Sequence, residues 1–235
     1  MNPITTEPII VNEEVMAKAS VRSLLCLPLY LAVPALFWYG FKLAGYEMDW
    51  QAFGLGALGW FIALLLRGPL SAVVMKLPRD QAANIIGLSS GVLEEGTRVI
   101  LLALTSVASS WALSVGQGWA AIEVLYVMIN IVAIASLVKR TDEKATQAKQ
   151  MLDAQGLVQT SPFWGILERI WASAFHIGCT LIVARYPWTV VALIPLHSGL
   201  NWFAVRLVKD SVGKSSILIA LFGISVLTVG LVIHS

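Results

Sequence analysis

Ionisable side chains occur inside stretches of the sequence that are otherwise apolar. Glu94, Glu95 and Arg98 fall within one such stretch, His176 within a second and His197 within a third. Burying an ionisable group at the centre of a membrane costs about 2.5–3.5 kcal/mol on insertion scales, so such groups usually face the interior of a helical bundle or a water-filled cavity. They are therefore the first candidates for chemistry.

These residue types could catalyse a hydrolysis, and peptide-bond hydrolysis is one example. The reaction needs a base that deprotonates water, a donor to the developing oxyanion and a proton for the leaving amine. Glu94 is the candidate base, and His176 could share or orient the water. His197 and Asn201 are four residues apart and lie on one helical face, where they could polarise the scissile carbonyl and hold its oxyanion.

The composition indicates which elements position these groups. Of the 235 residues 57% are hydrophobic and 13% are charged, whereas a soluble domain of this length would need far more polar surface. Apolar stretches of about 20 residues, enough to cross some 30 Å of hydrocarbon, predict about seven transmembrane helices. They lie near residues 21–45, 52–76, 82–107, 119–138, 162–185, 188–208 and 215–234. The predicted fold is an all-α polytopic bundle, a single transmembrane domain over residues 1–235.

The basic residues of the loops predict the orientation. Eleven of the 16 Lys and Arg residues fall on one side of the predicted bundle, two on the other and three inside spans. This bias predicts a cytoplasmic N-terminal segment, 1–20, and an external C-terminus. The polar loop 139–161 is then cytoplasmic, an amphipathic connector with basic residues at the lipid surface, and Ser161-Pro162 opens the next helix. An aromatic belt is predicted at the outer interface from Trp50, Trp111, Trp119, Tyr186 and Trp188.

Helix geometry places the candidate residues at one depth. Counted from the cytoplasmic end, Glu94 lies about 12 residues into its span, His176 about 14 and His197 about 11, which is roughly 16–21 Å at 1.5 Å per residue. Gly87 and Gly91, on the same side as Glu94, would let another helix approach closely. We therefore predict a polar pocket near the membrane centre, open towards the cytoplasmic half.

Each of these residues also has a purely structural interpretation. A glutamate–arginine pair in a membrane can be a structural ion pair, and a lone histidine is more often a hydrogen-bonding helix contact than a catalyst. Glu168 and Arg169 lie near enough to the cytoplasmic end to snorkel, and Glu123, near the outer end, could reach water. Arg67 is either a counter-ion for the glutamates or a snorkelling residue. The convergence of carboxylates, imidazoles and an amide favours a functional site.

Four segments resemble a known family. Residues 93–98 (LEEGTR) resemble the E-E-x-x-R motif of the YhfC intramembrane proteases, a branch of the CAAX-protease and bacteriocin-processing (abortive-infection-like) superfamily. Glu168-Arg169 followed by Phe175-His176 is similar to the second motif, and residues 197–201 (HSGLN) to the H-x-x-x-N/D motif. Gly116-x-Gly118 with Glu123 is similar to a glycine-rich segment that precedes a glutamate. The resemblance covers about residues 80–205, with two departures: Trp119 and Ala120 stand where relatives usually have a histidine, and Asn201 where an aspartate is more frequent.

The resemblance implies an intramembrane endopeptidase that cleaves membrane-associated proteins or peptides with a Glu-activated water. The implied catalytic residues are Glu94, Glu95, Arg98, His176, His197 and Asn201, supported by Glu123 and Arg169. If zinc is present, its ligands would be Glu94, His176 and His197, a three-ligand set with a free position for water. The better-understood members of the superfamily resemble glutamate-dependent proteases without an obligatory metal, and no H-E-x-x-H motif occurs here, so no cofactor is favoured and zinc is the alternative.

Two other classes of function fit a buried polar cluster. One is a non-catalytic scaffold like the Aph subunit of γ-secretase, which resembles this superfamily; both tandem glutamates and both histidines remain here, which favours the enzyme. The other is a proton-coupled transporter, against which we see no convincing internal repeat. The expected partners are membrane lipid and a membrane-protein or peptide substrate, with no nucleic acid. The expected location is the bacterial plasma membrane.

Overall fold

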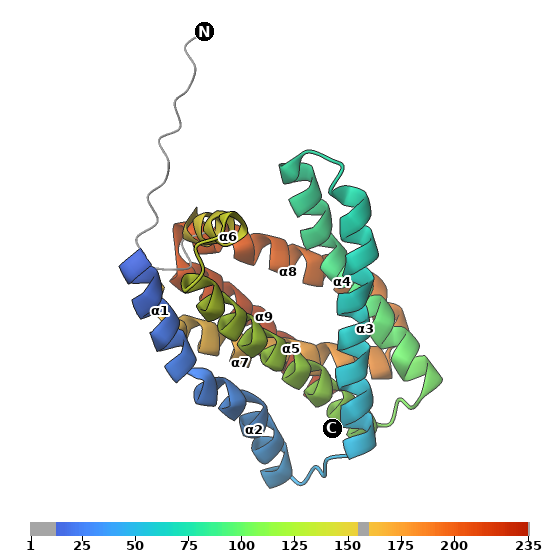
Figure 1. Ribbon diagram of the computed structural model, residues 1–235. Helices are drawn as coiled ribbons and strands as arrows, with labels where there is room; N and C mark the ends of the chain where they lie inside the picture. Colours follow the sequence, from blue (N-terminus) through green and yellow to red (C-terminus); the bar gives the residue numbers. More distant parts are fainter. Residues whose placement is uncertain (1–12, 155–159, 235) are drawn as a thin grey trace.

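The computed structural model describes residues 13–154 and 160–234, and this part of the chain folds into helices without any strand (Figure 1). The helices are α1 (Glu13–Leu25), α2 (Leu27–Leu43), α3 (Trp50–Val74), α4 (Arg79–Leu104), α5 (Ser109–Val138), α6 (Glu143–Ala154), α7 (Pro162–Arg185), α8 (Val190–Asp210) and α9 (Val212–Val232), with a short 3-10 helix, η2 (Pro187–Thr189). The protein is an all-α polytopic membrane bundle, as the sequence predicts.

Each predicted span corresponds to helical structure, but one differs in character from the rest. Six helical segments of the described chain are long and apolar enough to cross a membrane. The third predicted span, α4, is not among them because it carries Glu94, Glu95 and Arg98. Its 26 residues nevertheless extend about 39 Å, and it runs back alongside α3 (Figure 1).

The first predicted span is two helices rather than one. α1 ends at Leu25 and α2 begins at Leu27, with Pro28 in the first turn of α2, where the missing N–H of proline costs no hydrogen bond. Pro34 lies inside α2 without ending it. α1 already begins at Glu13, so the predicted N-terminal segment 1–20 is helical over its described part.

The fourth predicted span begins ten residues earlier than expected. α5 starts at Ser109 instead of residue 119, and Gly116 and Gly118 belong to the helix. The predicted start was wrong because serines and glycines are typical of loops in soluble proteins, whereas in membranes small residues let helices pack closely. A Cβ at Gly116 would lie 2.9 Å from the Cα of Ile177 on α7, and one at Gly118 would meet the Phe53 carbonyl on α3.

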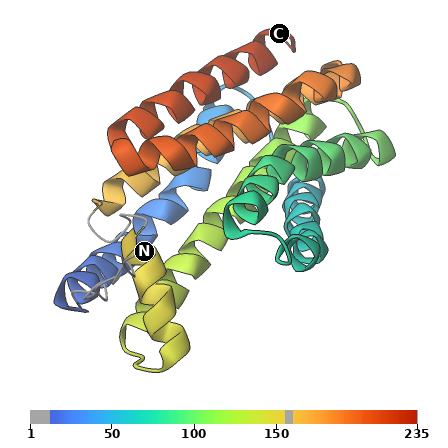
Figure 2. The ribbon, with the colours of Figure 1, turned by 90° about the horizontal axis from the view of Figure 1, so that it is seen from above.

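Small residues also bring the other helix pairs together. A Cβ at Gly178 of α7 would lie 2.5 Å from the Leu227 nitrogen of α9, so these two helices are in close backbone contact. A Cβ at Gly91 of α4 would meet the Ile194 carbonyl of α8, as the sequence predicts, whereas one at Gly87 would meet no atom of the described residues within 4 Å. α7 therefore packs against both α5 and α9. α3 and α4 lie at one side of the bundle and α1 and α2 at the other (Figure 2).

The predicted polar loop 139–161 contains α6. Ser161 accepts a hydrogen bond from the Phe163 N–H, so the predicted cap of α7 is confirmed. Lys149 of α6 is buried and lies 3.0 Å from Glu13 of α1. The expectation that the basic residues of this loop face lipid is therefore wrong for Lys149.

Candidate active site

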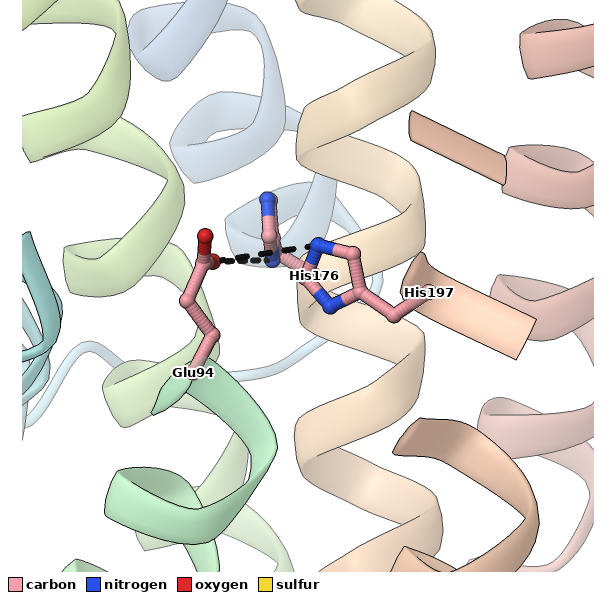
Figure 3. A group of neighbouring side chains, drawn as sticks. All are labelled: Glu94, His176 and His197. Atoms are coloured by element: carbon pink, nitrogen blue, oxygen red, sulfur yellow. Dashed lines mark ion pairs between the residues drawn. The ribbon is translucent and has the colours of Figure 1, made fainter. Parts of the chain in front are cut away.

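Three side chains from three helices meet inside the bundle. Glu94 comes from α4, His176 from α7 and His197 from α8, and they point towards one another (Figure 3). Nδ1 of His176 lies 4.0 Å from Oε2 of Glu94, and Nε2 of His197 lies 3.9 Å from the same oxygen. None of the three residues is more than 4% exposed. We call this group the central trio.

Glu94 is held in place by two further residues. Its Oε1 forms an ion pair with Arg67 of α3, and its Oε2 accepts a hydrogen bond of 3.4 Å from the indole Nε1–H of Trp119 on α5. Arg67 is therefore the counter-ion of Glu94, the first of the two roles that the sequence leaves open. The carboxylate is fixed with Oε2 directed at the imidazoles.

His197 is held by a buried ion pair. Its Nδ1 lies 2.8 Å from Oε1 of Glu95, and Glu95 forms an ion pair with Arg98 one turn along α4. Both members of that pair are completely buried, and the Arg98 guanidinium lies 4.5 Å above the Trp119 ring. Helical spacing alone suggests a pair between Glu94 and Arg98, but Arg98 binds Glu95 and leaves Glu94 to Arg67.

His176 has a similar carboxylate partner. Its Nε2 lies 2.5 Å from Oε2 of Glu123 on α5, whose Oε1 accepts a hydrogen bond of 2.5 Å from Arg169. Nδ1 of His176 lies 3.0 Å from Nη2 of Arg98. Because a guanidinium only donates, this contact makes Nδ1 the acceptor and leaves the proton of a neutral ring on Nε2. Nε2 is in close contact with Oε2 of Glu123, although this oxygen accepts no hydrogen bond from the described residues.

Two residues of α5 lie deeper than their sequence positions suggest. Trp119, expected in the outer aromatic belt, has no exposed surface and contacts Glu94 and Arg98. Glu123, expected near the outer end, lies beside His176. Both errors follow from the predicted start of this helix, which places Glu123 four residues from an end instead of fourteen. Trp50 and Trp188, by contrast, are strongly exposed, as a belt requires.

Asn201 lies near the central trio but is otherwise engaged. It follows His197 by one turn of α8, lines the same cavity, and its Nδ2 donates a hydrogen bond of 2.9 Å to the Ser90 hydroxyl on α4. Ser198 donates to the Leu88 carbonyl at 2.6 Å. These two bonds join α8 to α4, so Asn201 has a structural partner in addition to its place on the cavity wall.

The central trio lies at the inner end of a large cavity. The cavity has a volume of about 1220 Å³ and is lined by α3, α4, α5, α7, α8 and one residue of α9. Its lining residues on α4 lie at or before Glu94, those on α7 at or before His176, and those on α8 at or after His197. The cavity therefore extends from the trio towards the start of α4 and the end of α8, which is the half predicted to be cytoplasmic.

The donor atoms of the central trio fit a metal ion. One ligand atom from each residue lies within 4.8 Å of the other two, and two imidazole nitrogens with a carboxylate oxygen form a donor set that zinc prefers. Each imidazole has a carboxylate at its other nitrogen, the arrangement that orients metal-ligating histidines. When the Nδ1–H of a neutral His197 ring donates to Glu95, Nε2 carries a free lone pair and faces Glu94. A metal ion binds histidine in this neutral form.

Fold and site together describe an integral membrane protein with a buried carboxylate–imidazole centre at the end of a wide cavity. The chain belongs to the YhfC intramembrane metalloprotease family, whose profile matches residues 29–222. This range contains every residue that lines the cavity. Membership suggests intramembrane protease activity. Searches of curated proteins and of solved structures gave no match.

Proposed function

We propose that this protein is an intramembrane endopeptidase that hydrolyses peptide bonds of membrane-associated proteins or peptides. One observation carries the proposal: Glu94, His176 and His197 meet, buried, at the inner end of a cavity of about 1220 Å³. The cavity is long enough for an extended peptide, since α8 residues from His197 to Asp210 line it over about 20 Å and an extended chain rises about 3.3 Å per residue. About six substrate residues fit along this wall.

Glu94 is proposed as the group that activates water. Its Oε2 faces the space between the imidazoles, while Arg67 engages the other oxygen and so keeps the carboxylate in one orientation. A water in this space loses a proton to Glu94 as it attacks the scissile carbonyl carbon, and the protonated carboxyl then gives that proton to the leaving amine. Proton transfer of this kind is typically worth 10²–10⁴-fold in rate.

His197 fits a ligand role better than the oxyanion-binding role expected from the sequence. With its Nδ1–H directed at Glu95, a neutral ring has only a lone pair at Nε2 and cannot donate to an oxyanion. The remaining candidate donor is Asn201, whose amide lines the cavity and could turn from Ser90 to the substrate.

The donor set favours a metal over the metal-free mechanism, and Oε2 of Glu94 would then be a ligand instead of the base. Glu94, His176 and His197 would hold the ion, and zinc is the expected occupant. Bound there, the ion supplies Lewis-acid polarisation of the scissile carbonyl and helps to activate the water. From the motifs we also infer that the family is a branch of the CAAX-protease superfamily and that this chain lies in the bacterial plasma membrane. The charge bias of the loops supports a cytoplasmic N-terminus and an external C-terminus.

A comparison of membrane-protein N-termini tests the proposal. Cells that produce wild-type protein, Glu94→Gln or the control Glu143→Gln at equal membrane content are compared by mass spectrometry of newly formed N-termini. Glu143 lies exposed on α6, outside the cavity, so its variant removes a carboxylate without touching the site. We expect new N-termini with wild type and with Glu143→Gln, and none with Glu94→Gln.

The same purified proteins are analysed for metal before and after chelation. Cleavage that persists in Glu94→Gln would eliminate Glu94 as the base or ligand. Full activity in protein shown to contain no metal would return the site to the glutamate-only mechanism.

A further inference from the structure

Each histidine of the central trio contacts a carboxylate that is itself paired with an arginine. His197 contacts Glu95, which is paired with Arg98; His176 contacts Glu123, which is paired with Arg169. The first set is completely buried. The second extends to the cavity, because Glu123 and Arg169 are both lining residues, and Arg169 there meets a second carboxylate, Glu168.

We propose that Glu123 is the positioning residue of His176: it holds the imidazole through Nε2 so that Nδ1 faces Glu94 and can bind the metal. Arg169 in turn fixes the Glu123 carboxylate. The inference rests on the proposed function. It assigns specific roles to Glu123 and Arg169, which the sequence suggests only as supporting residues.

The need for Glu123 follows from the second contact of His176. In the structure Nδ1 accepts from Arg98, and a metal must take that same lone pair. When the ion binds, the Arg98 contact is lost, and the contact between Nε2 and Glu123 is the polar contact that can persist. Glu123 therefore keeps the ring oriented both before and after the ion arrives.

The position of Glu123 separates this role from a purely structural one. α5 also packs on α7 at a second place, because Gly116 brings the two helices into contact at Ile177, two turns of helix away. Arg169 does not distinguish its two carboxylates, since it lies 2.5 Å from both Glu123 and Glu168. Only Glu123 also contacts His176. Glu168 also lines the cavity and has the same arginine partner, but it is not among the carboxylates that pair with His176, so it is a matched control for the contact with the histidine.

The test measures zinc affinity of purified full-length protein by competition with a chromogenic chelator. Glu123→Gln keeps the size of the side chain and removes its charge, whereas Glu123→Asp keeps the charge and withdraws the carboxylate from Nε2. Loss of a carboxylate that orients a metal-ligating histidine typically costs 10–100-fold in metal affinity. We expect a loss of that size in both variants and less than about a threefold change in Glu168→Gln.

The absorption spectrum of the cobalt-substituted protein provides a second measurement, because it reports ligand geometry without requiring activity. We expect it to change in both Glu123 variants and to match wild type in Glu168→Gln. Because two different substitutions are used, a folding defect in one leaves the other to decide.

Wild-type affinity in both Glu123 variants, or an equal loss in Glu168→Gln, would overturn the proposal, as would a wild-type protein that binds no zinc. These results would leave the proposed peptide hydrolysis unaffected, because the Glu94→Gln comparison tests it separately. Normal zinc affinity without any cleavage would instead overturn the proposed function and leave the role of Glu123 intact.

Discussion

Removal of the Arg98 guanidinium is the most informative perturbation of this site. Arg98 and Glu95 are both fully buried, so Arg98→Met leaves the Glu95 carboxylate without its cation in a region of low dielectric. Breaking a buried ion pair from one side typically costs about 3–5 kcal/mol. The contact with Trp119, 4.5 Å from the guanidinium, adds about 2 kcal/mol when such a contact is desolvated. We expect Arg98→Met to lose about 5–7 kcal/mol of the free energy of unfolding.

The double variant separates stability from function. Glu95→Gln together with Arg98→Met removes both charges, and replacement of a buried ion pair by uncharged groups of similar volume is often neutral in stability. We therefore expect the double variant to regain most of the stability that Arg98→Met loses. Its activity and zinc affinity should stay low, because His197 no longer has a carboxylate at Nδ1.

Reversible unfolding in mixed micelles measures these free energies. Wild type, Glu95→Gln, Arg98→Met and the double variant together form a double-mutant cycle. A loss below about 1 kcal/mol in Arg98→Met would refute the reasoning, because it would mean that the pair is hydrated and not buried. A double variant as unstable as either single variant would refute it too. In that case the two side chains would stabilise the fold through separate contacts.

Two further predictions concern topology and packing. The charge bias of the loops predicts that tags at the N-terminus and in loop 139–161 are protected from an external probe and that a C-terminal tag is accessible to it. A protected C-terminal tag on inserted protein would exclude the predicted orientation. Gly91→Ala should lower the free energy of unfolding by about 1–3 kcal/mol, because the new Cβ meets the Ile194 carbonyl and lies 2.9 Å from the Ser198 nitrogen. Gly87→Ala, where the described residues leave open space for a Cβ, should be neutral or stabilising. Equal effects of the two substitutions in unfolding experiments would contradict the observed α4–α8 contact.

The sequence predicts the central trio because each of its members interrupts an apolar stretch. A charged or imidazole group in such a stretch must face the bundle interior, and helical rise places all three at one depth. Glycine spacing likewise predicts the close approach at Gly91. These inferences need only the properties of single helices and of the membrane.

The pairing of the charges could not be predicted in the same way. Whether Arg67 reaches Glu94 depends on the position of α3 relative to α4 along the helix axes. This position is set by packing between the helices. Trp119 and Glu123 were misplaced because residues 109–118 have the composition of a loop. A signal was present in the small residues of this segment, because a helix that begins at Ser109 uses Gly116 and Gly118 as contact points with neighbouring helices.

The charge pattern of α4 also has a consequence for the assembly of the protein during synthesis. On its own this helix is too polar to enter the membrane, since Glu94, Glu95 and Arg98 would each cost about 2.5–3.5 kcal/mol at the bilayer centre. Glu95 and Arg98 neutralise each other within α4, and the counter-ion of Glu94, Arg67, belongs to α3, which is synthesised immediately before. The two helices therefore form a hairpin whose four intramembrane charges cancel. This hairpin should insert as one unit while the helices that carry both histidines are still being made.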